Sequence, residues 1–164
     1  MIPELGLFAL ILALATALIQ AALPLIGASR GLRNWVMVAR PAAYAQALFI
    51  FTAYICLTIS FINNDFSTLY VAENSNTALP LIYRISGVWG AHEGSLLLWV
   101  LVLSGWGAAV ALFSRDLPDD FTARVLSVMG MIGVGFLLFI LLTSNPFERL
   151  PVAPPEGRDL NPLL

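Results

Sequence analysis

Four uncharged apolar runs of about 20 residues each constrain the fold of this chain more than any other feature. They cover residues 5–26, 42–62, 95–113 and 125–143. An α-helix rises about 1.5 Å per residue, so about 20 apolar residues cross the hydrocarbon core of a bilayer, which is about 30 Å thick. The sequence therefore predicts an all-α integral membrane protein whose residues 1–144 form a region of four transmembrane helices.

The balance of charged and apolar residues supports this prediction. Charged residues make up 11% of the chain and hydrophobic residues 59%, whereas an ordinary globular domain carries about 25% charged residues. The eight positive residues are all arginines and stand singly, so no basic face is available for nucleic acid. We therefore exclude nucleic-acid binding and expect membrane lipid to surround the apolar runs.

The arginines also predict how the chain is oriented, because positive residues near the ends of spans stay on the cytoplasmic side. Five arginines lie in the first and third connections between the spans, and three lie in the remaining segments. We therefore expect both termini, and the connection formed by residues 63–94, to lie outside the cytoplasm. The first run lacks the positive residues that begin a secretory signal, so we expect it to remain as a span.

Two segments outside the spans differ in composition. Residues 63–94 begin rich in Asn and Ser and become aromatic towards the third span. Residues 145–164 contain five of the ten prolines. Proline lacks a backbone donor and interrupts helices, so we expect this part to be an extended tail on the surface and not a domain.

Few polar side chains interrupt the spans. Gln20 and Gln46 lie near the ends of the first two spans, where an interhelical hydrogen bond is favoured over a polar relay. No charged residue lies in the middle of a span, which argues against an ion or proton path. Cys56 is the only cysteine, so we expect it to pack in the apolar interior, and we expect neither a disulfide nor a metal site.

The third and fourth spans carry small residues at the spacing that lets helix backbones approach each other in a membrane. The residues predicted to pack in this way are Ser104, Gly105, Ala108, Ala109, Gly130 and Gly133. These faces exceed what four short helices need for one another. We therefore expect some of them to pack against further helices that this chain does not contain.

The densest polar and aromatic segment reads Trp-Gly-Ala-His-Glu-Gly-Ser-Leu-Leu-Leu-Trp over residues 89–99. Glu93 and Ser95 are placed to cap a helix start, and tryptophan suits the membrane interface. His92, the only histidine, is able to bind haem or a metal or to transfer a proton, but a lone histidine favours a structural role. The candidate site residues are Arg84, Trp89, Gly90, His92, Glu93, Gly94, Ser95 and Trp99, of which Trp89, His92 and Glu93 are the candidates for cofactor contact.

This segment resembles one in the CcmF and NrfE family of cytochrome c-type biogenesis proteins. Further matching pieces lie before and after it, at residues 64–66, 70–77, 104–106, 135–140, 143–147 and 156–164. The resemblance implies the N-terminal part of a longer haem lyase subunit in the bacterial inner membrane. It also implies that residues 63–94 and both termini are periplasmic.

The resemblance further implies what the full assembly does. In the family, haem vinyl groups are joined to the thiols of a Cys-x-x-Cys-His segment of apocytochrome c, and haem b is part of the assembly. The implied partners are the remainder of the haem lyase, the haem chaperone CcmE, apocytochrome c and its thiol-presenting protein CcmH. The tryptophan-rich haem loop and the ligand histidines of the family have no counterpart in this sequence, so we expect the chain alone not to be catalytic.

Two other functions remain open from the sequence. The packing faces and the absence of charge within the spans also suit a structural membrane subunit of another respiratory or transport complex. A haem-binding module that uses His92 alone is the third hypothesis. The continuous match over residues 89–99 favours the haem lyase.

Overall fold

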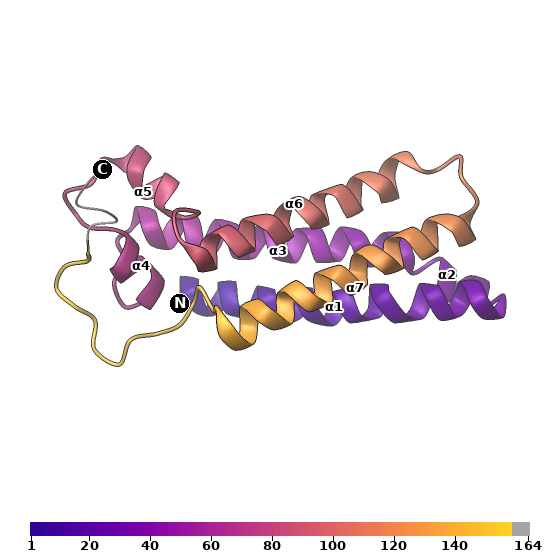
Figure 1. Cartoon of the computed structure of the whole chain (residues 1–164), viewed down its shortest axis with the longest axis horizontal. Coiled ribbons are helices and arrows are strands. Elements are labelled where there is room, and N and C mark those ends of the chain that lie inside the picture. Colours follow the sequence, from indigo (N-terminus) through magenta and orange to yellow (C-terminus); the bar gives the residue numbers. More distant parts are fainter. Residues whose placement is uncertain (159–164) are drawn as a thin grey trace.

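The computed structural model describes residues 1–158, which fold into seven helices. They are α1 (Ile2–Arg30), α2 (Arg33–Val36), α3 (Ala39–Ile62), α4 (Leu69–Asn74), α5 (Leu81–Gly87), α6 (His92–Phe113) and α7 (Asp119–Thr143). The four long helices run side by side, with α4 and α5 at one end of the bundle and α2 at the other (Figure 1). We call these the α4–α5 end and the α2 end.

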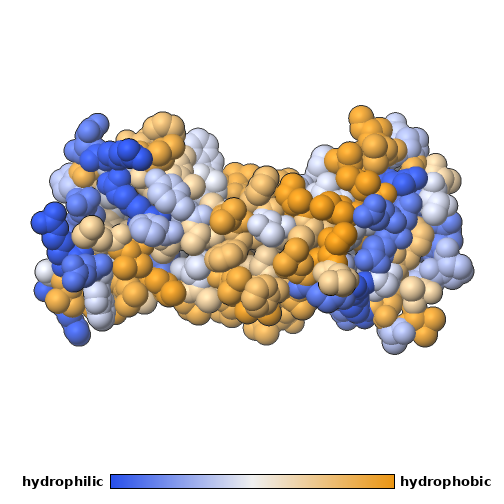
Figure 2. All heavy atoms as spheres, turned by 180° about the vertical axis from the view of Figure 1, so that it is seen from behind, coloured by the Kyte–Doolittle hydropathy of each residue, from blue (hydrophilic) through white to orange (hydrophobic). Residues whose placement is uncertain are grey.

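Four segments are long and apolar enough to cross a membrane, namely α1, α2 together with α3, α6, and α7. The predicted all-α fold with four transmembrane helices is therefore confirmed. The helices extend beyond the apolar runs, and α7 begins at Asp119 although its run begins at residue 125. A charged residue ends an apolar run without ending a helix, because the backbone hydrogen bonds continue into the headgroup region. Figure 2 shows the resulting surface, an apolar band between two hydrophilic ends.

The four long helices form one bundle in which α1 and α6 each pack against both α3 and α7. Because lipid is as apolar as the bundle interior, close packing and hydrogen bonds hold such helices together. The interior is filled by fully buried aliphatic side chains, including Leu10, Ile50, Leu57, Leu97, Leu137 and Ile140. Cys56 is buried among them, as expected.

Small residues allow α7 to approach α1 and α3 closely. A Cβ atom on Gly130 would lie 3.0 Å from the backbone nitrogen of Ala21, and one on Gly133 would lie 2.5 Å from Nε2 of Gln46. The interhelical hydrogen bond expected for Gln20 is present, because its Nε2 donates to the carbonyl oxygen of Leu126 over 2.8 Å. The α1–α7 and α3–α7 contacts therefore both depend on small residues of α7.

The small residues of α6 are placed differently. Ser104 is buried, and Ala108 and Ala109 are partly buried. Gly105 is exposed, and no heavy atom of the described residues lies within 4 Å of a Cβ atom built on it. Gly105 therefore packs against no other element within residues 1–158. Its contribution to packing against a further helix stays a prediction.

The segment expected as a loop, residues 63–94, is not wholly irregular, because it contains both α4 and α5. The chain leaves α3 through Asn64, whose φ of 51° is left-handed, a conformation that asparagine adopts more readily than most residues. Residues Tyr70, Val71 and Ala72 of α4 are buried against the bundle. Tertiary packing therefore stabilises a helix too short to be recognised by its sequence periodicity.

The described part of the tail, residues 145–158, contains no helix and folds back over the α4–α5 end (Figure 1). Thr68 and Arg149 form an isolated antiparallel bridge. Leu69 donates its backbone N–H to the oxygen of Glu148, and Leu150 donates to that of Ser67, both over 2.9 Å. The remaining residues of the predicted tail, 159–164, lie outside the described part of the chain.

Candidate functional site

The segment of residues 89–99 lies at the α4–α5 end, where the turn after α5 leads into α6. Trp89 is 45% exposed and Trp99 is 67% exposed, so both indole rings lie largely outside the bundle. Gly90 is also exposed, and its N–H donates to the oxygen of Gly87 over 3.1 Å. The two tryptophans are thus available to lipid, to further helices or to a partner.

Tyr70 of α4 fixes the turn that precedes α6. Its side chain is buried, and its hydroxyl donates to the carbonyl oxygen of Val88 over 3.1 Å and accepts the N–H of Ala91 over 3.3 Å. Its ring packs edge-to-face on Phe61, with the ring centres 5.4 Å apart. Burial raises the pKa of Tyr70 to about 12. The hydroxyl therefore stays protonated at neutral pH and acts as a fixed connector.

Gly94 is the residue that lets α6 approach this turn. A Cβ atom at this position would collide with the carbonyl oxygen of Val88 and would lie 2.6 Å from the hydroxyl of Tyr70. The obstacle is partly backbone, which cannot rotate away as a side chain can. Any side chain at position 94 must therefore separate α6 from the turn and from α4.

His92 lies in the first turn of α6 and is exposed. Its Nδ1 lies 3.3 Å from the Oγ of Ser144, and its ring packs edge-to-face on Phe139, with the ring centres 6.1 Å apart. An open apolar groove follows along α6 and α7, lined by His92, Leu96, Ile132, Gly135, Phe136 and Phe139. The groove lies on the surface of the bundle and not in its interior.

These residues do not by themselves make a haem site. The groove offers one imidazole and an apolar wall, and the chain has no second histidine. No group of three His, Cys, Asp or Glu side chains able to hold a metal ion occurs among residues 1–158. A haem in contact with this surface would need its enclosure, and any second axial ligand of a histidine pair, from outside residues 1–158.

The expectation that Ser95 caps the start of α6 is wrong. Its hydroxyl donates to the carbonyl oxygens of Ala91, over 2.6 Å, and His92, over 3.2 Å, so it does not accept a free N–H of the first turn. Serine inside a helix often bonds to the preceding turn in this way. Ala91 is the N-cap and makes no side-chain bond. Glu93 is in the first turn, where its negative charge suits the helix dipole.

Arg84 connects α5 to the end of α3. Its Nε donates to the carbonyl oxygen of Leu79 over 2.9 Å, and its Nη2 donates to that of Thr77 over 3.0 Å. Its Nη1 reaches the carbonyl oxygen of Ile62 over 3.4 Å. Arg84, which the sequence placed in the surface motif, therefore also joins α5 to the segment before it and to the end of α3.

A clamp around Arg149 was not predicted from the sequence. Its Nη2 lies 2.5 Å from Oε1 of Glu4 at the start of α1, and its Nη1 lies 3.5 Å from Oδ2 of Asp65. The Nη1 atom also donates to the Oγ of Ser67. Arg149 thereby joins the tail, the start of α1 and the segment after α3.

A second clamp holds the end of the described tail. Oε2 of Glu156 accepts the hydroxyl of Thr77 over 2.6 Å, and Oε1 accepts the Thr77 N–H over 2.9 Å. Arg158 donates its N–H to the carbonyl oxygen of Ala72 over 2.7 Å. Gly157 fits between them because a Cβ atom there would collide with the oxygen of Ser75. The only sequence signal for this clamp was that residues 156–164 match the family.

The second clamp predicts a pH dependence for the position of the tail. The Thr77 hydroxyl and N–H lower the pKa of Glu156. A lowered pKa in the folded state means that the clamp is complete above the unfolded value, about 4.3, and is lost as pH falls through the lower folded value. We therefore expect the tail to stay docked through the neutral range and to detach only in acid, below the unfolded carboxyl value of about 4.3.

A spin label on Val152→Cys, in a Cys56→Ser background, measures this effect. Val152 is 80% exposed, so the label does not disturb packing. Its mobility should rise only in the acidic range, and the matched variant Glu156→Gln should show no such pH dependence. A rise in mobility between pH 7 and pH 6 would show that another group controls the tail.

The sequence of this chain matches known proteins over its whole length. The family described as cytochrome C assembly protein matches residues 89–164, which begin at the motif. The chain is 62% identical to the cytochrome c-type biogenesis protein CcmF of Pseudomonas aeruginosa, over 100% of this chain and 25% of that protein. It is 57% identical to the cytochrome c-type biogenesis protein ccl1 of Rhodobacter capsulatus, over 100% of this chain and 25% of that protein.

A solved structure agrees with these sequence matches. The Cytochrome c Heme Lyase CcmF superimposes with a TM-score of 0.85 at 30% identity, over 90% of this chain and 25% of that chain. The chain belongs to the CcmF family of cytochrome c-type biogenesis proteins. It spans about a quarter of the length of the CcmF relatives that it matches. The resemblance seen in the sequence is thereby confirmed, and CcmF provides the frame for the proposals below.

Proposed function

We propose that this chain forms the N-terminal membrane portion of a cytochrome c haem lyase and contributes to the delivery and covalent attachment of haem to apocytochrome c. The observation that carries the proposal is the match to the solved haem lyase over 90% of the chain. The motif of residues 89–99 joins α6 to a turn fixed by Tyr70 and Gly94. Residues 1–158 offer only an open groove beside His92, and in this proposal they form one wall of the assembly.

The proposed setting is the bacterial inner membrane, with the α4–α5 end in the periplasm. Positive residues support this orientation, because the connections at the α2 end and the helix ends beside them contain Arg30, Arg33, Arg40, Arg115 and Arg124. The α4–α5 end has Arg84 and Arg149, which are bonded to carbonyl oxygens and carboxylates respectively, and Arg158. Five of the eight arginines therefore lie at the α2 end.

The α4–α5 end also supplies the surface on which partners would dock. Leu81, Ile82 and Tyr83 of α5 are 54%, 72% and 58% exposed. Figure 2 shows apolar atoms over this part of the molecule, beyond the central apolar band. Apolar patches beyond the membrane band mark interaction sites. The proposed partners there are the remainder of the haem lyase, the haem chaperone CcmE, CcmH and apocytochrome c, with haem as the group transferred.

Complementation in a strain without its own CcmF tests the proposal. The chain is expressed together with a polypeptide carrying the other three quarters of a CcmF protein. We expect the two to purify together and to restore cytochromes that retain haem under denaturing conditions, whereas neither alone should do so. Equal cytochrome maturation without the chain, or purification with an unrelated respiratory or transport complex, would contradict it.

A pair of variants locates the docking surface in the same strain. Ile82→Asp places a charge on the exposed face of α5, and we expect it to reduce mature cytochrome c about tenfold, which corresponds to about 1.4 kcal/mol of lost docking. Leu117→Asp makes the same kind of change at the α2 end, where Leu117 is 47% exposed, and should have little effect. Equal losses in the two variants would show that α5 has no special role.

A further inference from the structure

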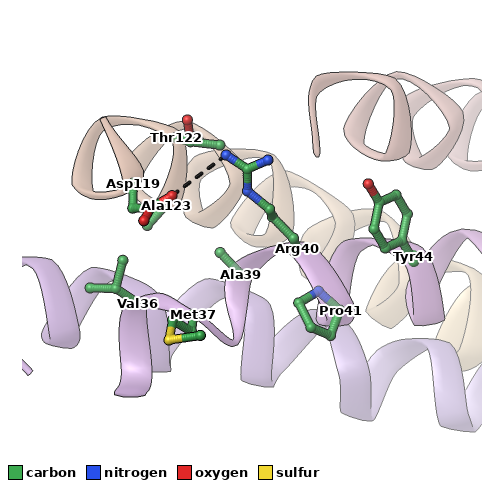
Figure 3. Close-up of a pocket in the computed structure, with 9 residues that line it drawn as sticks. All are labelled: Val36, Met37, Ala39, Arg40, Pro41, Tyr44, Asp119, Thr122 and Ala123. Carbon is green, nitrogen blue, oxygen red and sulfur yellow. Dashed lines mark ion pairs between the residues drawn. The ribbon is translucent and has the colours of Figure 1, made fainter. Parts of the chain in front are cut away.

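A hollow of about 330 Å³ at the α2 end is unrelated to the proposed lyase surface. It lies between the start of α3 and the first turn of α7 (Figure 3). Because α7 begins at Asp119, after the polar connection from α6, this level corresponds to the headgroup region of the membrane. A ligand here would therefore meet both water and lipid.

Two opposite charges stand side by side in the hollow. Nη2 of Arg40 lies 3.6 Å from Oδ1 of Asp119, and the Arg40 side chain is 24% exposed while that of Asp119 is 61% exposed. Figure 3 shows the two groups facing each other across the space between α3 and α7. An ion pair at this distance is weak, and both side chains can still form hydrogen bonds with a ligand.

The guanidinium of Arg40 is held in position from behind. Its Nη1 donates to the carbonyl oxygen of Ala111 and its Nη2 donates to that of Ser114, both over 3.1 Å, at the end of α6. Its Nε has no hydrogen-bond partner among residues 1–158. Arginine carries five N–H donors, so several remain for a ligand. The cation is therefore fixed before any ligand arrives.

The other walls of the hollow are mostly apolar. Val36 is buried and Pro41 lies beside Arg40, while Tyr44 presents a partly exposed ring with its hydroxyl. The Oγ1 of Thr122 is buried and has no hydrogen-bond partner within the described part of the chain. Paired charges next to an apolar wall suit a molecule with a polar end and hydrocarbon chains.

The adjacent charges determine which polar end fits. A simple anion would be repelled by Asp119, and a simple cation would be repelled by Arg40. A group that carries both charges satisfies both residues. Phosphatidylethanolamine has a phosphate two carbons away from a primary ammonium, which donates three hydrogen bonds. Phosphatidylcholine has the same charges but no N–H donor, and phosphatidylglycerol has no positive charge.

We propose that this hollow binds the headgroup of phosphatidylethanolamine, with its phosphate at Arg40, its ammonium at Asp119 and its hydrocarbon chains against the apolar wall. Pockets between membrane helices that contain basic residues are known to hold lipid headgroups. The lipid would link α3 to α7 at the α2 end, beside the buried cluster in which Ala39 and Ala43 of α3 join Ala123 and Leu126 of α7. The proposal does not depend on the haem lyase function.

Lipid retention measured by native mass spectrometry tests the proposal. The chain is reconstituted in nanodiscs with equal amounts of phosphatidylethanolamine, phosphatidylcholine and phosphatidylglycerol, and is then released into mild detergent. We expect phosphatidylethanolamine to be retained about fivefold over phosphatidylcholine, which corresponds to about 1 kcal/mol. In Asp119→Asn this preference should fall to about equal retention. The matched control Asp116→Asn, an exposed acid of the same connection, should keep it.

A second measurement uses only the wild-type chain, so it does not depend on the folding of a variant. Adding one, two and three methyl groups to the ammonium removes its N–H donors one at a time, and retention should fall with each step. Equal retention of phosphatidylethanolamine and phosphatidylcholine would overturn the proposal. Preference for phosphatidylglycerol, or displacement of the lipid by millimolar inorganic phosphate, would also overturn it, because either result would indicate a simple anion site.

Discussion

Replacing Gly94 with alanine is expected to destabilise the chain by about 3 kcal/mol, at the upper end of the usual cost of overpacking. The added methyl group would collide with the backbone oxygen of Val88 and crowd the hydroxyl of Tyr70. Relief requires α6 to move away from the turn, which breaks the hydrogen bonds of Tyr70 to Val88 and Ala91. The buried Tyr70 hydroxyl, the buried Val88 carbonyl and the partly buried Ala91 N–H would then lose these partners, and each such loss is costly.

Denaturant unfolding in detergent micelles, followed by circular dichroism, measures this loss. Gly105→Ala is the matched control, because it makes the same change in the same helix where the described residues leave open space. Alanine also favours a helix over glycine by about 1 kcal/mol, so the control should be neutral or slightly stabilised. Similar stability of the two variants would show that α6 is not held tightly against the turn.

The same substitution has a functional consequence if the chain acts in a haem lyase. Gly94 sets how α6 meets the turn that carries Trp89, so its replacement should also alter the exposed surface of residues 89–99. In the complementation strain, Gly94→Ala should therefore lower cytochrome maturation more than Gly105→Ala. Equal maturation in both variants would contradict this prediction, and would show that the surface set by Gly94 does not affect maturation.

The membrane fold could be predicted because it depends on a property that is local in the sequence. The length of an apolar run decides whether it can cross the bilayer, and the number of such runs gives the number of crossings. All four runs are helical in the structure. The ends of the helices could not be read in the same way. Arg30 and Asp119 interrupt hydrophobicity but not backbone hydrogen bonding, so both lie within helices that continue beyond the apolar runs.

The glycines show why the packing was only partly predictable. Gly105 and Gly133 both fit the small-residue pattern, but the pattern does not say which face of a helix meets another helix. Gly133 meets Gln46 of α3, whereas Gly105 points away from every element of residues 1–158. The close approach at Gly94 depends on Tyr70, a residue 24 positions earlier in the sequence.

The sequence motif of residues 89–99 marked the candidate site, but the contacts that hold the neighbouring tail in place could not be predicted. Arg149 and Glu156 hold the tail through partners that lie 145 and 79 positions away in the sequence. Pairings over such separations follow no helical or strand period, so the tail was expected only to be extended. The structure shows that the tail, α4 and the start of α1 form one connected layer at the α4–α5 end.

Replacing Gly130 with leucine is the second change for which a large loss is expected. A Cβ atom at this position would lie 3.0 Å from the backbone nitrogen of Ala21 and 3.2 Å from the carbonyl carbon of Gln20. Alanine requires only a small shift there, but leucine adds three further carbons against the backbone of α1. We expect α7 to separate from α1, breaking the hydrogen bond from Gln20 to Leu126 and costing about 3 kcal/mol or more.

Gly135→Leu provides the matched control on the same helix, because no heavy atom of the described residues lies within 4 Å of a Cβ atom at Gly135. Denaturant unfolding in detergent micelles measures the stability of the two leucine variants. Gly130→Leu should unfold at lower denaturant than wild type, and Gly135→Leu should not. If both variants lose stability equally, the helix faces assigned here are wrong. If Gly135→Leu is stable alone yet fails to purify with the remaining part of a CcmF protein, its face of α7 receives a helix from that part.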